Sequence, residues 1–410
     1  MLQGLAGIAA LLALAWVLSE DRARIPWRTV IGGVLLQAAL ALLLIGFPPA
    51  TRAILLLNDA ADALQRATDA GTSFVFGYLA GPPLPFVETH PGASFILAFK
   101  ALPLVLVISA LASLLFHWGV LQQVMRGFAW LLRRWLGVGG ALALGAAVHV
   151  FVGMIEAPLL VRPWLARMQR GEIFALMTCG MAGIAGTVMV IYAAILGPVI
   201  PNALGNILIA SVISTPAALA IAALMVPFGP GEQAARLALP HAPVSALDAV
   251  VKGTADGIPV LVGIVAVLLV TVALVTLLNM MLAVLPFDHA LTLQRIFAWP
   301  FQVVMWLIGI PWSEAPDAAA LMATKTVLNE FVAYLHLAAL PPETLSPRSR
   351  LIMTYAMCGF ANFGSLGILV GGLGAMVPER RQEIVALGFR SILAGTLATC
   401  TSGAVAGMLG

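Results

Sequence analysis

Residues 149–163 read His-Val-Phe-Val-Gly-Met-Ile-Glu-Ala-Pro-Leu-Leu-Val-Arg-Pro and set one carboxylate, Glu156, in a mostly apolar segment. Pro158 follows two residues later, and proline disfavours a continuous helix because it lacks an amide hydrogen and restricts its neighbour. Ionisable groups inside a membrane are costly and are usually retained for function. The stretch therefore predicts an interrupted, functional element at membrane depth.

A second carboxylate stands in a comparable setting in the other half of the chain. Residues 329–334 read Asn-Glu-Phe-Val-Ala-Tyr, and prolines interrupt the apolar sequence before them. We expect Asn329 to cap a helix that begins there. Two lone carboxylates in two broken apolar segments indicate a binding site inside a membrane.

The composition establishes the class of protein. The 410 residues are 61% hydrophobic and 10% charged, with a mean hydropathy of +1.03, whereas soluble proteins average roughly 45–50% apolar and about 25% charged residues. Apolar runs of about 20 residues predict spanning helices, because the strands of a transmembrane barrel would be shorter and alternating. The chain is therefore expected to be an all-α polytopic protein that resides in the plasma membrane.

Charge and cysteine content exclude other classes. The formal charge of +3 is small and the basic residues gather beside apolar segments, which is typical of membrane orientation signals and gives no reason to expect a nucleic-acid partner. Cys179, Cys358 and Cys400 stand singly in apolar sequence, so neither a disulfide framework nor a metal site is indicated, and no cofactor is expected.

The apolar pattern predicts about eight transmembrane helices, two re-entrant hairpins and interfacial helices. The expected spans are residues 3–19, 29–47, 94–116, 172–196, 204–227, 257–286, 349–377 and 383–409. We divide the chain into an N-terminal part (1–93), a first repeat (94–227) with a hairpin around 141–165, a polar linker (228–256), and a second repeat (257–410) with a hairpin around 294–340.

The two repeats match in outline, because each offers a carboxylate-bearing hairpin followed by a glycine-rich helix. This organisation is expected of secondary transporters built from inverted repeats. The sequence contains no Walker A motif, so ATP-driven transport by this chain alone is not expected. A channel or passive facilitator, an intramembrane hydrolase acting through Glu156 or His149, and a structural scaffold remain as alternatives, although no nucleophile or metal set supports the hydrolase.

Four stretches, in order, resemble the concentrative nucleoside transporter family over nearly the whole chain. They are Phe74-Val-Phe-Gly77, Gly153-x-x-Glu156-Ala-Pro-Leu-Leu-x-Arg162-Pro163, Lys325-x-x-x-Asn329-Glu330-Phe-Val-Ala-Tyr334, and Tyr355-x-x-Cys358-Gly-Phe-Ala-Asn362-Phe-Gly-Ser365. The resemblance implies a homotrimer in the lipid bilayer, with a central scaffold and mobile transport domains that carry nucleosides by an elevator-like motion.

The resemblance also implies roles for individual residues. Glu330, Asn362 and Ser365 would bind the ribose hydroxyls, which suits their donor and acceptor groups, and Phe360 would pack near the nucleobase. Glu156 would lie on the base side. Members of the sodium-coupled kind usually carry Gln and then Thr or Ser just before this Glu, but this chain has Met154 and Ile155 there. Neither side chain can hydrogen-bond a uracil edge, so pyrimidine selectivity is not expected.

The ion-coupling positions depart from the family pattern as well. His149 replaces a sodium-ligating Asn, and Gly183 replaces a hydroxyl residue, which leaves backbone carbonyls at Val152 and Gly183 as oxygen ligands. We therefore expect coupling to protons, carried by His149 or Glu156. Sodium-coupled symport and passive transport of a related sugar-containing solute stay open.

Overall fold

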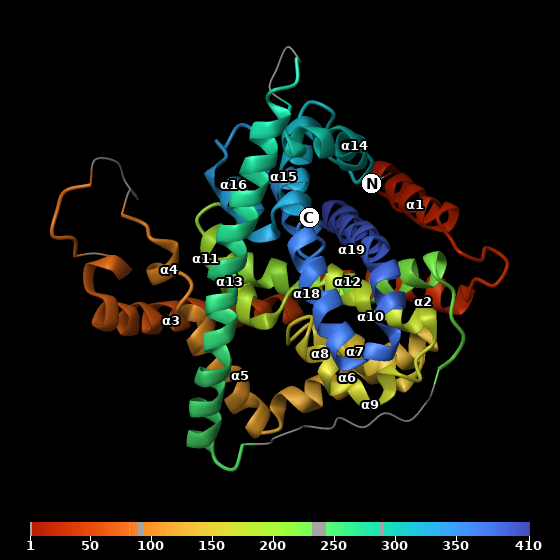
Figure 1. Ribbon diagram of the computed structural model, residues 1–410, viewed down its shortest axis with the longest axis horizontal. Helices are drawn as coiled ribbons and strands as arrows, with labels where there is room; N and C mark the ends of the chain where they lie inside the picture. The colour runs from red at the N-terminus through yellow and green to blue at the C-terminus, as the bar shows by residue number, and fades with distance from the viewer. Residues whose placement is uncertain (1, 82, 89–93, 232–242, 287–290) are drawn as a thin grey trace.

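The computed structural model describes residues 2–81, 83–88, 94–231, 243–286 and 291–410. Within these ranges the chain is helical and has no strand, which confirms the all-α class (Figure 1). Its helices are, in chain order, α1 (Leu2–Val17), α2 (Trp27–Gly46), α3 (Pro48–Phe76), η1 (Gly77–Ala80), α4 (Leu97–Lys100), α5 (Leu104–His117), α6 (Val120–Leu136), α7 (Gly140–His149), α8 (Glu156–Leu160), α9 (Arg162–Leu165), α10 (Arg170–Ala182), α11 (Gly186–Leu196), α12 (Ala203–Met225), α13 (Ala246–Leu282), α14 (Leu293–Leu307), α15 (Ala315–Val327), α16 (Glu330–Ala339), α17 (Pro347–Ala356), α18 (Phe363–Met376), η2 (Pro378–Arg380) and α19 (Arg381–Leu409).

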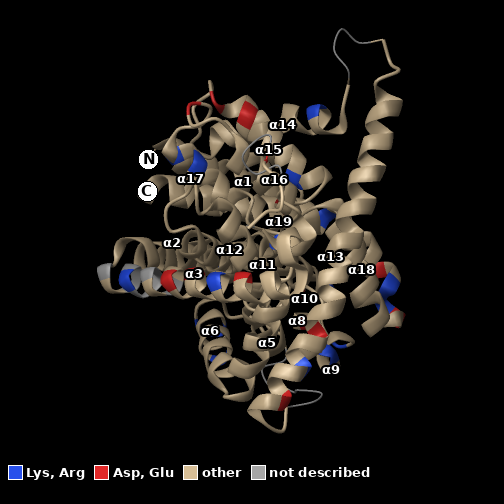
Figure 2. Ribbon diagram, turned by 90° about the vertical axis from the view of Figure 1, so that its left-hand side faces the viewer, with Lys and Arg blue, Asp and Glu red and all other residues tan. Residues whose placement is uncertain are grey.

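Six segments of the described chain are long and apolar enough to cross a membrane. They are Trp27–Gly46, Leu97–His117, Arg170–Leu196, Ala203–Met225, Ala246–Leu282 and Pro378–Leu409. Shorter apolar helices such as α1 and α18 accompany them, so the expected total of about eight spans is consistent with this fold. Lys, Arg, Asp and Glu gather mainly toward the ends and edges of the bundle, whereas its centre is almost free of them (Figure 2).

Three of the expected spans are interrupted. A break at residues 101–103 separates α4 from α5, where Pro103 cannot donate a helical hydrogen bond. We call residues 183–185, between α10 and α11, the first break, and residues 357–362, between α17 and α18, the second break. Each break frees backbone groups in the interior of the protein, where they need partners.

Two helix pairs form the hairpins. The first hairpin is α7–α8, whose helices are separated by residues 150–155, and the second hairpin is α15–α16, separated by residues 328–329. The range 294–340 also contains α14, a separate amphipathic helix that packs against α15. Helix α13 begins at Ala246, inside the range expected to be a polar linker, because Ser245 caps it by accepting a hydrogen bond from the Asp248 amide at 3.1 Å. Residues 89–93 and 232–242 lie outside the described ranges.

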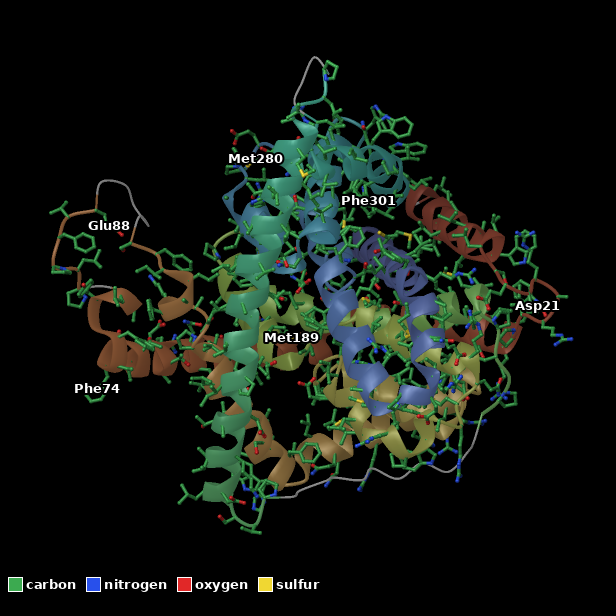
Figure 3. All side chains as sticks on the ribbon, viewed as in Figure 1. Asp21, Phe74, Glu88, Met189, Met280 and Phe301 are labelled. Carbon is green, nitrogen blue, oxygen red and sulfur yellow. The ribbon has the colours of Figure 1, made fainter. Side chains whose placement is uncertain are left out.

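The helices form a buried bundle and a peripheral pair. Helices α10, α12 and α19 pack on one another, and α12 is almost wholly buried. Helix α13 packs mainly on α5 and runs along one side of this bundle (Figure 1). Figure 3 places Met189 of α11 near the centre of the molecule and Phe74 of α3 at its outer edge. Helix α11, which follows the first break, contacts both α5 and α12.

Candidate functional site

A cavity of about 800 Å³ opens where the hairpins and breaks face α5 and α13. All the predicted site residues except His149 and Gly183 line it, namely Val152, Met154, Ile155, Glu156, Glu330, Phe360, Asn362 and Ser365. The volume falls within the range of roughly 300–1,000 Å³ that is usual for small-molecule sites. The fold thus brings together residues that are up to about 200 positions apart in the sequence.

Glu330 is held in one orientation at the start of α16. Asn329 caps this helix, since its Oδ1 accepts from the Val332 amide at 2.9 Å, as expected. The Glu330 side chain is 4% exposed. Its Oε1 accepts from the Tyr192 hydroxyl at 2.7 Å and its Oε2 accepts from Asn362 Nδ2 at 2.9 Å. Hydrogen bonds to a carboxylate are about twice as strong as those between neutral groups.

Asn362 has its own orientation fixed by the second break. It is the N-cap residue of α18, and its Oδ1 accepts from the Ser365 amide at 2.7 Å. Because Oδ1 is used for the cap, Nδ2 must point the other way, toward Glu330. Ser365 also faces the cavity. The spacing of three residues between Asn362 and Ser365 therefore reflects a capped helix start as well as a shared face.

Tyr192 was not among the residues selected from the sequence. It lies in α11, is 3% exposed, and its ring packs against those of Phe331 and Tyr334 with centroid distances of 6.0 and 5.2 Å. A buried tyrosine hydroxyl usually finds a partner, and the sequence contains only four tyrosines. A tyrosine inside an apolar helix was a usable signal, but nothing in the sequence indicated that its partner would be Glu330.

The two breaks cross at the centre of the protein. The Phe360 amide in the second break donates to the Gly183 carbonyl in the first break at 3.2 Å. A Cβ on Gly359 would lie 2.7 Å from the carbonyl oxygen of Met181, so the backbones approach too closely for any other residue. The Gly186 amide donates to the Phe151 carbonyl at 3.2 Å and joins the first hairpin to this crossing.

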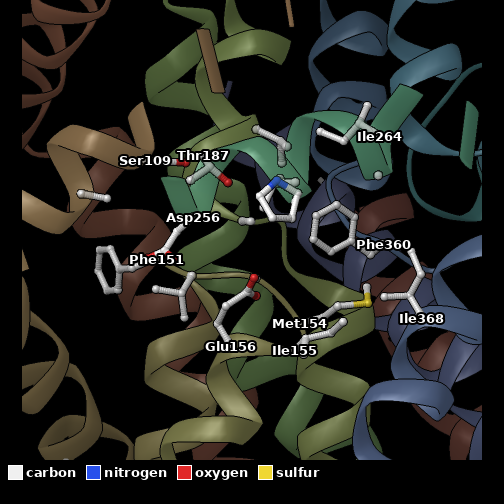
Figure 4. A pocket seen from close by; sticks show the side chains of 18 of the residues that line it. Ser109, Phe151, Met154, Ile155, Glu156, Thr187, Asp256, Ile264, Phe360 and Ile368 are labelled. Carbon is white, nitrogen blue, oxygen red and sulfur yellow. The ribbon is translucent and has the colours of Figure 1, made fainter. Parts of the chain in front are cut away.

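The opposite wall of the cavity is mostly apolar. Figure 4 shows Glu156 pointing into the cavity, with the Met154 sulfur beside Ile368 and below Phe360. Ile155 packs against α18, because its Cγ1 lies 3.2 Å from the position of a Cβ on Gly372. Glu156 is exposed to the cavity, and a Cβ on Gly153 would collide with its carboxylate. This wall therefore offers one carboxylate among apolar side chains.

His149 and Gly183 lie close together behind this wall. His149 is 3% exposed, and its Nε2 has no hydrogen-bond partner among the described residues. The position of a Cβ on Gly183 is 3.5 Å from Ser211 Oγ and 4.0 Å from the His149 carbonyl oxygen. The Ser211 hydroxyl likewise lacks a described partner. Ser211 lies in the buried helix α12 and was not selected from the sequence.

The peripheral helices add polar groups to the cavity. The cavity is also lined by Ser109 of α5, Asp256 of α13 and Thr187 of α11. Figure 4 shows Asp256 on the same side of the cavity as Glu156. These three residues were not among the predicted site residues, because the apolar pattern does not show which face of α13 meets the hairpins.

Comparison with known proteins identifies the family. The family described as "Na+ dependent nucleoside transporter C-terminus" matches residues 206–407, its N-terminal counterpart matches residues 6–79, and "Nucleoside recognition" matches residues 98–199. The nucleoside permease NupC of Helicobacter pylori is 32% identical over 98% of this chain and 96% of its own length. The chain belongs to the concentrative nucleoside transporter family.

Other relatives of this transporter agree. The putative nucleoside permease NupX of Escherichia coli is 31% identical over 99% of this chain and 98% of its own length. Human solute carrier family 28 member 3 is 33% identical over 98% of the chain, which spans 59% of the human protein. The structure of CNTnw in an inward-facing substrate-bound state is similar with a TM-score of 0.90 and 35% identity, covering 100% of this chain and 98% of that one. The protein is therefore a multi-pass membrane protein of a transporter family.

Proposed function

We propose that the protein imports nucleosides across the plasma membrane by symport with a cation, and that this cation is the proton. The observation that carries the proposal is the buried Glu330 carboxylate, which faces a cavity of about 800 Å³ and has each oxygen held by a donor. The names of the related permeases and their similarity over almost the whole chain support the nucleoside as substrate.

Glu330 suits the vicinal hydroxyls of a ribose. A carboxylate offers about four acceptor positions, and Tyr192 and Asn362 use two of them. The remaining positions can accept from the 2′- and 3′-hydroxyls, while the Ser365 hydroxyl can donate or accept beside them. Because the carboxylate is already oriented, little ordering entropy is lost when the sugar binds.

The base side favours broad recognition over pyrimidine selectivity. Phe360 offers a ring face for a nucleobase, and Met154 and Ile368 continue the apolar surface (Figure 4). Glu156 is an acceptor, so it favours bases that donate from an exocyclic amino group, which adenine, guanine and cytosine carry and uracil lacks. We therefore place adenosine, guanosine and cytidine above uridine as substrates.

We assign the transported proton to Glu156. Its carboxylate reaches the cavity, where substrate and water can meet it. Charging His149 would bury an imidazolium without any described acceptor for Nε2, which is costly. Sodium coupling is the second candidate, because the His149 carbonyl and the Ser211 hydroxyl both lie near Gly183 and oxygen atoms are the ligands that hard cations prefer.

The proposed motion is an elevator-type movement within a homotrimer. The α5–α13 pair would serve as the scaffold, because α13 packs mainly on α5 and only 6% of its most apolar stretch is buried inside the protein. The hairpins, the breaks and the bundle around α12 would move together. Residues 94–227 and 257–410 would form the two inverted repeats.

Uptake into proteoliposomes with imposed gradients tests this function. Purified protein is given labelled purine and pyrimidine nucleosides under a pH gradient, a sodium gradient or neither, with Glu330→Gln as the inactive control. We expect accumulation driven by the pH gradient and abolished by a protonophore. Accumulation that requires sodium and ignores the protonophore would overturn proton coupling, and equilibration without accumulation would indicate a passive facilitator.

A further inference from the structure

Helix α6 is amphipathic, and all its charged side chains are basic. One side of the helix packs against α2, α5 and α7. The other side carries three exposed arginines, Arg126, Arg133 and Arg134, while the helix contains no acidic residue. Amphipathic helices with a basic polar face lie along membrane surfaces. The proposed function gives this surface no role.

The last turn of α6 is fixed against the start of α2. The Arg28 guanidinium donates to the Arg134 carbonyl at 3.3 Å, and the Thr29 hydroxyl donates to the Leu136 carbonyl at 3.0 Å. These bonds satisfy carbonyls that the end of a helix leaves without intrahelical partners. A guanidinium has five N–H donors, so Arg28 keeps donors for a further acceptor.

Two exposed tryptophans adjoin these arginines. Trp27 precedes Arg28 and is 57% exposed, and Trp135 follows Arg134 and is 44% exposed. The ion pairs between described residues include neither Arg28 nor Arg134. Tryptophan rings prefer the boundary between the headgroups and the hydrocarbon of a membrane. We call Trp27, Arg28, Arg134 and Trp135 the α6 patch.

Helix α3 is also amphipathic, but its charge is mixed. It carries two arginines and three aspartates, and Figure 2 shows both signs along it. Helix α3 begins at the far end of α2, a helix of 20 residues, and thus about 30 Å from Arg28. The two ends of α2 therefore differ in charge. Basic residues beside a span are typical of its cytoplasmic end, where anionic headgroups attract them.

We infer that the α6 patch binds the headgroup of an anionic phospholipid. Arg28 and Arg134 donate to its phosphate, since a guanidinium can place two parallel N–H groups on two phosphate oxygens. Trp27 and Trp135 contact the lipid where its headgroup meets the acyl chains. The bound lipid stabilises the contact between α6 and α2, and α6 leads through residues 137–139 into the first hairpin. The inference is independent of the transported substrate.

Lipid titration of the delipidated protein in detergent tests this binding. The Tm is followed against phosphatidylglycerol, phosphatidylcholine with the same acyl chains, and glycerol 3-phosphate. We expect phosphatidylglycerol to raise the Tm, because a ligand that binds only the folded protein stabilises it, and the other two compounds to leave it unchanged. An equal rise with phosphatidylcholine would overturn recognition of the anionic charge. A rise with glycerol 3-phosphate would assign the patch to a soluble phosphate and overturn the lipid.

Arginine variants locate the binding. Arg134→Gln leaves the backbone carbonyl that Arg28 contacts in place, so the protein should fold. The midpoint of the phosphatidylglycerol titration should rise about 5-fold in Arg134→Gln and about 30-fold in Arg28→Gln/Arg134→Gln. Arg134→Lys keeps the charge but loses the paired donors, so its midpoint should lie between wild type and Arg134→Gln.

The matched control removes the same charge from α3. Arg52→Gln/Arg66→Gln should keep the wild-type midpoint, because these arginines lie beyond the far end of α2 from the patch. An Arg134→Gln protein that keeps the wild-type midpoint would overturn the inference, even if the double variant did not fold. Equal shifts in the α3 control and the patch variants would likewise replace a site with a general effect of net charge and contradict it.

Discussion

The two hairpins hold their acids in opposite ways. In the second hairpin Glu330 is 4% exposed and accepts two side-chain hydrogen bonds at the start of a ten-residue helix that Asn329 caps. In the first hairpin Glu156 faces the cavity at the start of α8, which has five residues and no side-chain cap. Pro158 lies inside α8, and this helix ends two residues after it.

The hairpins also differ in how they are anchored. The Arg350 guanidinium donates to the carbonyls of Leu337, Leu340, Pro341 and Leu345 at the end of α16. Arg380 donates to the carbonyls of Leu165 and Met168 after the first hairpin, but it also pairs with Glu383. Glu383 in turn lies near Arg170, which is bound to Glu20. Among the described residues, Arg350 therefore anchors the second hairpin through carbonyls alone. Arg380, beside the first hairpin, also depends on a carboxylate.

This difference separates two tasks within one cavity. A preorganised acid suits the constant part of a nucleoside, the ribose, because fixed acceptors cost little to order. A less constrained acid suits the variable base and a titrating proton.

The largest effect is expected for the two acids. Glu330→Gln should weaken nucleoside binding by more than about 100-fold, because charge-assisted bonds to two hydroxyls, worth about 1.5–3 kcal/mol each, are lost. Glu156→Gln should weaken it by only about 10-fold. Binding by isothermal titration to both purified variants checks this order, and equal losses would remove the distinction between the hairpins.

The next effect concerns the two capping asparagines. Asn362→Asp keeps an acceptor for the Ser365 amide but sets a second carboxylate against Glu330, and like charges this close disfavour joint ionisation. We expect affinity to fall about 30-fold with little change in Tm. Asn329→Asp keeps the cap of α16 through its bond from the Val332 amide, and no hydrogen bond joins its described side chain to Glu330, so its affinity should stay within about 2-fold. A similar loss in both variants would show that capping alone accounts for Asn362.

The Tyr192 hydroxyl should have a smaller effect. Tyr192→Phe removes one donor from Glu330, which corresponds to about 1.5 kcal/mol or roughly 10-fold in affinity. Tyr334→Phe is the control, because its hydroxyl donates to the Thr354 carbonyl at 2.8 Å instead of to an acid. Uptake kinetics should show the change in Tyr192→Phe mainly as a raised KM. An unchanged KM would mean that Asn362 orients Glu330 without help.

The smallest effect tests the carboxylate-dependent anchor. The hydrogen bond from Arg170 lowers the pKa of Glu20 below its ordinary value of 4.5. Because the folded-state pKa is the lower one, the interaction stabilises the protein fully above pH 4.5, and this stabilisation disappears as the pH falls through the lowered pKa. Glu20 is partly exposed, so the contribution should be less than about 1 kcal/mol.

The Tm of wild type and Glu20→Gln, measured between pH 7 and pH 3, checks this anchor. The wild type should unfold at a slightly higher temperature above pH 4.5, and the difference should shrink as the pH falls below 4.5. A difference that grows as the pH falls would contradict the assigned direction.

Much of the fold followed from local sequence features. The apolar runs predicted spanning helices, and Pro158 predicted a broken hairpin, because both depend on neighbouring residues alone. Glu330, Asn362 and Ser365 were selected because their stretches resemble those of the concentrative nucleoside transporter family, and their donor and acceptor groups suit a sugar. The breaks at 183–185 and 357–362 were expected only as glycine-loosened helices, since glycine permits a break but does not require one.

The contacts between distant segments could not be predicted. Tyr192 and Glu330 are 138 positions apart, and no periodicity indicates that α11 meets α16. The same holds for Ser211 beside Gly183 and for the face of α13 that presents Asp256. These residues complete the site through the crossing of the two breaks, which is a property of the tertiary fold.

Binding of deoxynucleosides tests the central claim most directly. Affinities of adenosine, 2′-deoxyadenosine and 3′-deoxyadenosine are measured for wild type, Glu330→Gln and Glu156→Gln. If the second hairpin binds the ribose, removing a hydroxyl should cost the wild type and Glu156→Gln about 10-fold or more, and should cost Glu330→Gln almost nothing. A penalty that persists in Glu330→Gln and disappears in Glu156→Gln would reverse the assignment and contradict the account.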